Sequence, residues 1–466
     1  MPQRALTTLQ QAASVFHLDL QREGFVPSPE EAKAIQDHSD LLLSEIGRLD
    51  AILHDLATAR EKLIAQVDVH RSLTSPVHRL FPELLSEIFL KATESQLTSL
   101  DPTNMPRTIA RVSTTWRRVA RATPRLWTHV VATSASELDK YIDLYFNLSL
   151  ECPLDMHCRD HRLLLNFWSR LGPYAQRWRS VRFVGNGDVL RDLGHVHAAH
   201  LESLYIDAFG GPFHAKRILN LTAPRLQRLA VHLVALDTDC QTFLQPTSLK
   251  MLATLVINVI YPFPATYVLP VLRLCAATLV HVEIDVIDPQ AYEQTFRSGL
   301  SMQPLSMHSL KRIDLSHSAC AIFYHITAPK LEVIKVTDGV DYLPDAMEAF
   351  TTRTTSPSRI RLLEVDINER ADVTHDGVTS MIHVLERMDN LEELRISSFP
   401  SPNPDAVLEC LVCRGDTPPL VSNLREFEYA DYQSLDLLLE VYRTRKEERI
   451  VQGKRVAALS CTYTDW

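Results

Sequence analysis

The chain contains 466 residues, of which 45% are hydrophobic, and carries a formal net charge of −9 at pH 7. Its length allows two or three domains or one elongated array, and its negative charge disfavours general binding to nucleic acid or to anionic membranes, since both need a basic surface. The longest apolar stretch, residues 252–261, is too short to cross a bilayer, no secretory signal is visible, and the eight cysteines are scattered, so we expect an intracellular protein, cytoplasmic or nuclear, with reduced thiols.

The first 74 residues contain one long predicted helix. Residues 1–27 show no sustained periodicity, and we expect a loosely ordered tail there. A helix should begin at Ser28, because a serine cap, a proline at the first helical position and a glutamate three residues after the cap occur together. It should end before Ser75-Pro76, so residues 28–74 are predicted to form one amphipathic or coiled-coil helix.

Apolar residues of this helix recur in alternating steps of four and three, which is the spacing of a coiled-coil seam. The seam residues are Ile35, Leu42, Ile46, Leu49, Leu53, Leu56, Leu63 and Val67. Two interpretations fit this seam. It packs against helices of the same chain, which the interruption at Arg60 favours, or it joins two copies of the chain into a homo-oligomer through residues 35–67.

Residues 75–127 contain two short predicted helices with apolar faces. The first begins at Pro82, and its apolar face consists of Leu84, Leu85, Ile88 and Phe89. The second, over 107–121, has an apolar face made of Ile109, Val112, Trp116, Val119 and Ala120, and arginines occupy most of its other side. A segment of this size rarely buries enough apolar surface to be stable alone, so both helices should pack on a neighbouring domain or on another protein.

Three motifs of this segment resemble the F-box, in the variant frequent in fungal F-box proteins. They are L-x-P-E-L-L-x-x-I-F at 80–89, V-S-x-x-W-R at 112–117 and P-R-L-W at 124–127. One departure is Phe81, which separates Leu80 from Pro82 where the family commonly has leucine and proline adjacent. The resemblance implies that residues 75–127 form an F-box-like domain that docks onto the Skp subunit of a cullin–RING ubiquitin ligase. The implied docking residues are Leu80, Pro82, Leu84, Leu85, Ile88, Phe89, Val112, Trp116, Val119, Leu126 and Trp127.

Beyond residue 127 the pattern L-x-x-L-x-L recurs at intervals of 21 to 33 residues, which is typical of leucine-rich repeats. The motifs begin at Trp178, Leu201, Leu226, Leu252, Leu279, Leu310, Leu331, Leu362, Leu391 and Leu424. The last two apolar residues of each motif lie on one face of a strand, and no single repeat can bury that face alone, so the repeats must stack.

Further segments extend this array. Val130-Val131 and residues 154–156 are predicted to begin it, with a helix over 136–148 between them, and returns such as 163–171 and 378–388 read as helices. We therefore predict an α/β protein in which an N-terminal helix and all-α F-box helices precede a leucine-rich-repeat horseshoe with a parallel sheet over 128–466.

Residues between the inward-facing apolar ones point to the concave side of such an array. In the later repeats they are acid-rich, namely Glu283, Asp285, Asp314, Glu364, Asp366, Glu393, Glu426 and Glu428. The opposing charges there are Arg312, Lys335 and Arg395. This strip either attracts a basic segment of a protein substrate or is solvated charge that keeps a repeat protein soluble.

The sequence contains little that indicates catalysis. Neither a Walker loop nor a dinucleotide-binding fingerprint is present. The histidines and cysteines at 152–161 lack the spacing of a zinc protease helix, and Cys410-x-x-Cys413 has no second pair, so ordinary structural roles are favoured for both groups. We expect no catalytic residues, no metal and no cofactor.

Together these features predict a substrate-recognition adaptor of an SCF-type cullin–RING ligase and not an enzyme. The F-box-like segment would dock onto the Skp subunit and the repeats would hold a protein substrate, while the ligase chemistry lies with other subunits. The main alternative is a ligase-independent leucine-rich-repeat scaffold for protein interactions. A hydrolase with its site at 152–161 is the weakest alternative.

Overall fold

The structure is a computed structural model that describes residues 2–15, 19, 22–95, 104–132, 135–186, 189, 193–209, 221–233, 246–260, 264–287, 303–355, 357–367, 373, 375–400, 405–414, 418–429 and 435–460. The chain divides into two compact units, Met1–Leu85 and Ser86–Trp466. The predicted F-box-like segment is therefore divided, and its residues from 86 onward belong to the same unit as the sheet.

The first unit contains the helices α1 (Pro2–Val15) and α3 (Pro29–Thr74) and the short 3-10 helix η1 (Pro76–Arg79). The predicted start of α3 is confirmed: the Ser28 hydroxyl accepts a hydrogen bond from the Glu31 backbone, and the Glu31 carboxylate accepts one from the Ser28 backbone. Its predicted end is also confirmed, since Ser75 is the C-cap.

Helix α1 corrects the prediction of a loosely ordered tail over residues 1–27. Its half-buried residues recur at helical spacing, at Ala5, Thr8 and Ala12, and the helix contacts α3. Two of these side chains are alanines and the third is a small threonine, so they carry almost no apolar periodicity in the sequence. The contact with α3 stabilises a helix that the sequence pattern alone does not indicate.

Four short helical elements precede the sheet: α4 (Pro82–Ser95), α5 (Asn104–Val112), α6 (Thr114–Arg121) and η2 (Pro124–Trp127). The single helix predicted over 107–121 is wrong, because it is interrupted at Ser113. This residue is extended, with φ −155° and ψ 168°, and its hydroxyl accepts a hydrogen bond from the Trp116 backbone at 3.1 Å. Ser113 is therefore the N-cap of α6, a role for which serine is among the preferred residues.

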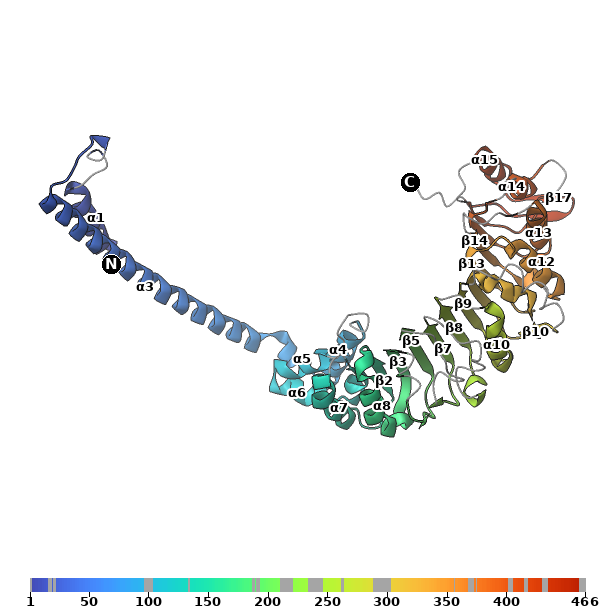
Figure 1. Ribbon diagram of the computed structural model, residues 1–466, viewed down its shortest axis with the longest axis horizontal. Helices are drawn as coiled ribbons and strands as arrows, with labels where there is room; N and C mark the ends of the chain where they lie inside the picture. The colour runs from blue at the N-terminus through green and yellow to red at the C-terminus, as the bar shows by residue number, and fades with distance from the viewer. Residues whose placement is uncertain are drawn as a thin grey trace. The chain divides into compact units, whose positions relative to one another are not determined.

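Twelve strands form one sheet in which every strand is parallel to its neighbours. In sheet order they are β1 (His129–Ala132), β2 (Leu154–Cys158), β3 (Trp178–Asn186), β5 (Ser203–Phe209), β7 (Arg228–Leu233), β8 (Thr254–Val259), β9 (His281–Val286), β11 (Arg312–His317), β13 (Val333–Gly339), β14 (Leu362–Ile367), β15 (Glu393–Ser398) and β16 (Glu426–Tyr429). Figure 1 shows these strands following one another along an arc within the second unit, with helices on the outer side. The sheet thus has one face covered by helices and one face that no described helix covers, which we call the concave face.

Where the structure describes them, the connections on the outer side contain helices or short two-stranded sheets. The helices are α7 (Ala135–Ser149), α8 (Leu164–Leu171), α10 (Leu269–Cys275), α12 (Leu343–Arg353), α13 (His375–Glu386), α14 (Asp405–Leu411) and α15 (Leu435–Thr444), with the 3-10 helices η3 (His161–Leu163), η4 (Gly172–Arg177), η5 (Pro246–Leu249), η6 (Ala265–Val268), η8 (Ser318–Tyr324) and η9 (Pro357–Arg359). Strand β4 (Val196–His197) pairs in parallel with β6 (Leu221–Thr222), and β10 (Leu305–Ser306) pairs in parallel with β12 (Ile326–Thr327). After α15, β17 (Arg449–Val451) and β18 (Lys454–Val456) form an antiparallel hairpin. The helices predicted over 136–148, 163–171 and 378–388 are confirmed.

The strands predicted from the repeated motif are all present, and their burial alternates as the motif requires. In β9, for example, Val282 and Ile284 are fully buried while Glu283 between them is exposed. The register predicted for the repeat at 362 is wrong. Leu362 pairs with Glu393 in a concave-face position, while Leu363 points inward and Ile360 takes the anchoring position.

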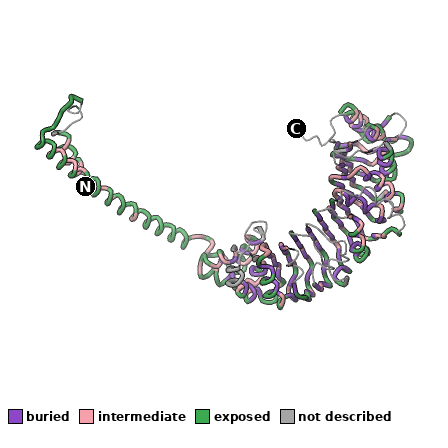
Figure 2. The backbone as a smooth tube through the Cα atoms, viewed as in Figure 1, coloured by how far each residue is buried: buried purple, intermediate pink, exposed green. Residues whose placement is uncertain are grey.

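Burial differs sharply between the two units. Figure 2 shows buried residues concentrated along the strands of the second unit, whereas α3 is exposed over most of its length. Among the helices of the described residues, none combines the length with the apolar character that crossing a membrane demands.

Candidate protein-interaction surfaces

The docking residues implied by the F-box resemblance fall into three groups. Leu85, Phe89, Val119, Leu126 and Trp127 are buried; Leu80 and Trp116 are half-buried; Pro82, Leu84, Ile88 and Val112 are exposed. A partner can reach the second and third groups without rearrangement of the protein. The five buried residues are therefore core residues of the described structure, and their predicted role as docking contacts stays a prediction.

Aromatic contacts hold the helices of this segment together. The Phe89 and Trp116 rings lie 4.8 Å apart between centroids, which joins α4 to α6. The Trp127 indole donates a hydrogen bond to the Ala120 carbonyl at 2.8 Å and meets the edge of the Tyr145 ring, with 5.2 Å between centroids. Trp127 thus links η2 to both α6 and α7.

The exposed apolar residues of the segment are large and close in sequence. Leu84 is 52% exposed and Ile88 is 48% exposed, and they lie one helical turn apart on α4. Val112, at the end of α5, is 58% exposed, and Phe81, just before α4, is 71% exposed. Adjacent exposed apolar side chains on one helix are typical of a protein contact, whereas single scattered ones are not.

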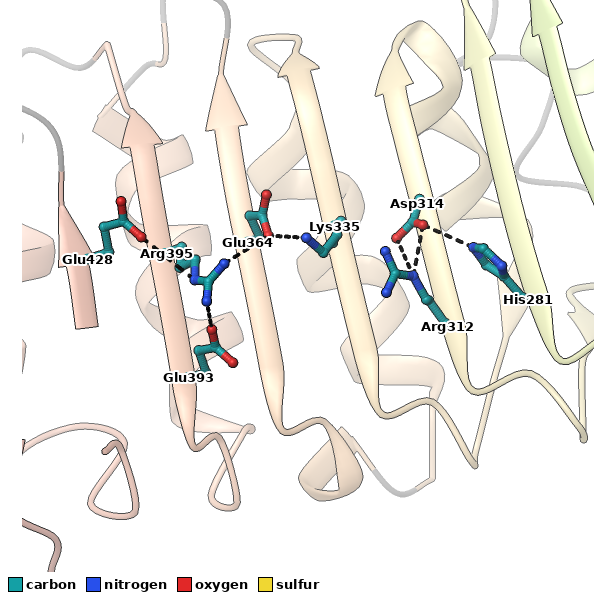
Figure 3. Close-up of polar contacts among 8 residues, drawn as sticks. All are labelled: His281, Arg312, Asp314, Lys335, Glu364, Glu393, Arg395 and Glu428. Carbon is teal, nitrogen blue, oxygen red and sulfur yellow. Dashed lines mark hydrogen bonds and ion pairs between the residues drawn. The ribbon is translucent and has the colours of Figure 1, made fainter. Parts of the chain in front are cut away.

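The acidic residues predicted on the concave face lie in rows across the strands. Glu283, Asp314, Lys335, Glu364, Arg395 and Glu428 occupy one row from β9 to β16, each in register with the next. Figure 3 shows this row from Asp314 to Glu428 as seen from the concave side, with the helices behind the strands. Glu393 and Glu426 lie in a second row with His281 and Arg312.

Ion pairs connect many of these charges. Lys335 Nζ lies 2.5 Å from a Glu364 oxygen, and Arg395 pairs with Glu364 at 3.9 Å, with Glu428 at 3.7 Å and with Glu393 (Figure 3). The strip is therefore a ladder of partly compensated charges and not the free acidic surface that its composition indicates. Its eight acidic residues still exceed Arg312, Lys335 and Arg395 by five charges.

A second cluster on this face surrounds Asp314. Arg312 Nε lies 2.9 Å from Asp314 Oδ2, and His281 Nε2 lies 3.0 Å from the same oxygen. Burial acts to raise the pKa of Asp314, but the hydrogen bonds from His281 and Arg312 outweigh it and hold the pKa below its ordinary value.

This cluster also contains the one group of potential metal ligands that the described residues bring together. One ligand atom from each of His281, Glu283 and Asp314 lies within 4.8 Å of the others. Arg312 already donates to both oxygens of Asp314, at 3.1 Å and 2.9 Å, so a cation bound there would have to displace or repel a guanidinium. The arrangement is better suited to an ion-paired carboxylate than to a metal ligand.

A polar chain at the carboxyl ends of the strands was not predicted. Asn258 donates to Asp285 at 3.1 Å, and Asp285 lies 2.9 Å from His317 Nδ1. His317 and Asp338 both have positive φ, 55° and 50°, which side chains other than glycine seldom adopt. Because these contacts join residues about thirty positions apart, they depend on strand register, for which the sequence has no direct signal.

The histidines and cysteines at 152–161 do not converge on a catalytic arrangement. His157 and Cys158 are neighbours on β2 and therefore point to opposite faces of the sheet. Burial raises the pKa of the Cys158 thiol to about 12, so this sulfur is not an activated nucleophile. Cys410 and Cys413 are free; Cys410 lies on α14, whose Val407, Leu408 and Leu411 are buried, and Cys413 follows the helix.

His157 should make stability depend on pH. Burial, with Arg159 and Arg182 nearby, lowers its pKa from 6.5 to about 4. Between pH 6.5 and pH 4 the His157 side chain binds a proton in the unfolded chain but not in the folded protein. The stability that neutral His157 allows is therefore fully present above pH 6.5 and is lost as the pH falls toward 4. At pH 4.5 the loss specific to His157 should be about 2 kcal/mol. Urea denaturation at pH 7 and pH 4.5 should show a smaller decrease for His157→Gln than for wild type, while the same change at the exposed His197 should leave the decrease unaltered.

The seam on α3 is covered only in part. Ile35, Leu42 and Leu49 are half-buried in the half of the helix nearest α1, whereas Leu53, Leu56, Leu63 and Val67 are all exposed. Within the described residues, packing in the chain therefore leaves Ile46 and the seam from Leu53 onward exposed. Pairing of two copies through this part remains a prediction, which sedimentation of the full chain over a range of concentrations would check.

In comparisons with known proteins, no family model matches the chain and no curated protein matches its sequence. A functional proposal therefore depends on the exposed apolar residues near α4 and on the charges of the concave face.

Proposed function

We propose that this chain is the substrate-recognition adaptor of an SCF-type cullin–RING ubiquitin ligase. The observation that carries the proposal is the division of the F-box-like motif residues into a buried core, which includes Phe89 and Trp127, and an exposed apolar pair, Leu84 and Ile88. A docking module needs both parts, since the core fixes the helices and the exposed residues contribute the apolar area of the interface.

The proposal extends to the fold of the second unit, which we assign to the leucine-rich-repeat class. Its support is one parallel strand per repeat, placed in chain order, with an anchoring leucine or isoleucine buried before each strand from β5 to β16. In such an adaptor the concave face holds the substrate protein. The chain then contributes position and effective concentration to ubiquitin transfer, while the chemistry belongs to other subunits.

Binding to the purified Skp subunit tests the proposal directly. The full chain and the Skp subunit, mixed and analysed by size-exclusion chromatography and calorimetry, should form a stable complex. A chain that is folded by circular dichroism but forms no complex would contradict the ligase role. The ligase-independent scaffold would then be the better proposal, since its support is the concave face alone.

The concave acidic residues are proposed to attract a basic segment of the substrate. Glu283 and Glu426 are exposed, and changing both to lysine alters the strip without removing a member of the Lys335–Glu364–Arg395 ladder. The double variant should bind a fluorescein-labelled lysine-rich peptide about 10-fold more weakly than wild type at low salt. The difference should shrink at 0.5 M salt, since exposed charges are screened beyond a Debye length of ~10 Å at 0.1 M.

The control for this measurement is the same charge reversal at Glu151 and Glu386, which are exposed outside the concave face. Equal weakening by both double variants would show that only net charge matters. The strip would then be solvated surface, and the loops would be the next place to search for substrate contacts.

A further inference from the structure

The early strands of the concave face carry the opposite charge to the late ones. The concave positions of β3, β5, β7 and β8 are Ser180, Arg182, Val184, Asn186, Ser203, Tyr205, Asp207, Phe209, Arg228, Ala230, His232, Thr254, Val256 and Asn258. Two of these are arginines and one is acidic, whereas acidic residues dominate the strip from β9 to β16. The sign of the surface charge therefore changes along the sheet.

The two arginines differ from the other concave cations in having no acidic partner among the described residues. Arg312, Lys335 and Arg395 each lie within 4.0 Å of a carboxylate, and Arg179, at the edge of the face, pairs with Asp155. For Arg182 and Arg228 no such pair exists within the described part of the chain. Two guanidinium groups without a counter-charge on one surface favour an anionic ligand.

Arg182 is also held in position by its neighbours. Its Cζ lies 4.0 Å from the centre of the Tyr205 ring, and the Tyr205 and His232 rings follow with 4.9 Å between their centroids. Stacking restrains the guanidinium plane while leaving its N–H groups available at the edges, which is the arrangement that binds a carboxylate with two parallel hydrogen bonds. Burial is the main reason that the pKa of His157 on the adjacent strand is lowered to about 4, and the positive charges of Arg159 and Arg182 add to this effect.

Asp207 sets a limit on the ligand charge. It lies two residues after Tyr205 on the same face and in register with His232. The early concave positions thus carry two arginines and one carboxylate, a net charge of one positive unit with His232 neutral. This balance fits carboxylate side chains better than the more highly charged phosphate group.

We propose that the concave positions of β3, β5 and β7 bind an acidic peptide segment of a partner protein, with Arg182 and Arg228 as its carboxylate partners and Tyr205 as the platform that orients Arg182. The site is separate from the acid-rich strip and does not depend on the ligase role. If both sites act on one partner, that partner carries an acidic and a basic segment, and the order of the two fixes its direction along the sheet.

Fluorescence anisotropy with a labelled Gly-Ser peptide that contains four glutamates tests the site on the full chain. A peptide with glutamine in place of glutamate should bind about 10-fold more weakly, and the R182A/R228A double variant should lower affinity for the glutamate peptide by about the same factor. Arg182→Lys keeps the charge but loses the stacked fork, and it should bind with intermediate affinity.

A matched control removes two arginines from the outer side, Arg273 of α10 and Arg443 of α15, which are exposed like Arg182 and Arg228. This R273A/R443A variant should bind the glutamate peptide within about 2-fold of wild type, because both charges lie away from the concave face. Thermal unfolding of all variants should match wild type, since the changed side chains are exposed.

Three results would overturn the proposal. If R182A/R228A binds the glutamate peptide as tightly as wild type, the two arginines do not form a binding site. If the control variant weakens binding equally, the attraction is nonspecific and depends on net charge. A peptide with phosphoserine in place of glutamate that binds at least about 10-fold more tightly through the same arginines would replace the carboxylate assignment by a phosphate site.

Discussion

Replacing both Leu84 and Ile88 with aspartate should abolish detectable binding to the Skp subunit while leaving the fold intact. The two side chains are about half exposed, so the core does not depend on them. Burying an apolar side chain of this size in an interface contributes about 1.5–3 kcal/mol, so losing two of them should weaken binding by at least about 100-fold. Two buried carboxylates would add a desolvation cost to this loss. Calorimetric titration with the purified Skp subunit measures the change.

The control replaces Leu165 and Leu435 with aspartate. These leucines are exposed on α8 and α15, on the outer side of the second unit, so the chemical change is the same at a site away from α4. This variant should bind the Skp subunit like wild type. Normal binding by L84D/I88D together with a normal thermal unfolding curve would show that α4 is not the docking helix.

The strand positions could be predicted because the repeat reports directly on burial. In each motif the two apolar residues separated by one position lie on the same side of a strand, and a third apolar residue before them anchors the turn. The error at 362 has the same origin. Leu362, Leu363, Val365 and Ile367 are all apolar, so the pattern fits two registers, and only the buried Ile360 distinguishes them.

Two helical errors have different causes. The break at Ser113 had a signal that was missed, since a serine directly before the next helical turn is a preferred N-cap. Helix α1 had little signal, because alanine and threonine contribute only weakly to its contact face and the helix is stabilised by α3. Tertiary contact outweighed local pattern there.

The candidate surfaces could be predicted as sets of residues but not as arrangements. The acidic residues of the concave face were identified from the motif, yet Lys335 and Glu364 are 29 residues apart, and their pairing follows from the register of β13 and β14. The stack of Arg182 on Tyr205 has the same basis. Burial likewise divided the apolar residues of the 80–127 segment, since an amphipathic pattern predicts that a face is covered but does not say whether the cover is the same chain or a partner.

Replacing Trp127 with alanine should destabilise the second unit strongly and should affect Skp binding only through this loss of fold. The side chain is 2% exposed, donates to the Ala120 carbonyl and packs against Tyr145, so its removal leaves a cavity and removes one hydrogen bond, while the Ala120 carbonyl still accepts from the Thr123 backbone at 3.2 Å. Truncating a buried tryptophan costs about 3–5 kcal/mol. Trp127→Phe keeps most of the buried area and loses one hydrogen bond, which should cost about 0.5–1.5 kcal/mol because the Ala120 carbonyl keeps its backbone donor. Urea denaturation followed by circular dichroism would rank the two variants.

Trp127 is the last residue of η2, two residues before the start of β1, and a core role and a docking role predict different results when it is replaced. If Trp127 is a core residue, the free chain should lose stability in proportion to the side-chain volume removed. The free energy of unfolding should then be lowest for Trp127→Ala, higher for Trp127→Phe and highest for wild type. A docking residue predicts normal stability and weak Skp binding for both variants. If Trp127→Ala leaves the denaturation midpoint of the free chain unchanged, Trp127 would be assigned to the Skp interface and not to the core. In that case β1 would be held in the sheet by its pairing with β2 alone.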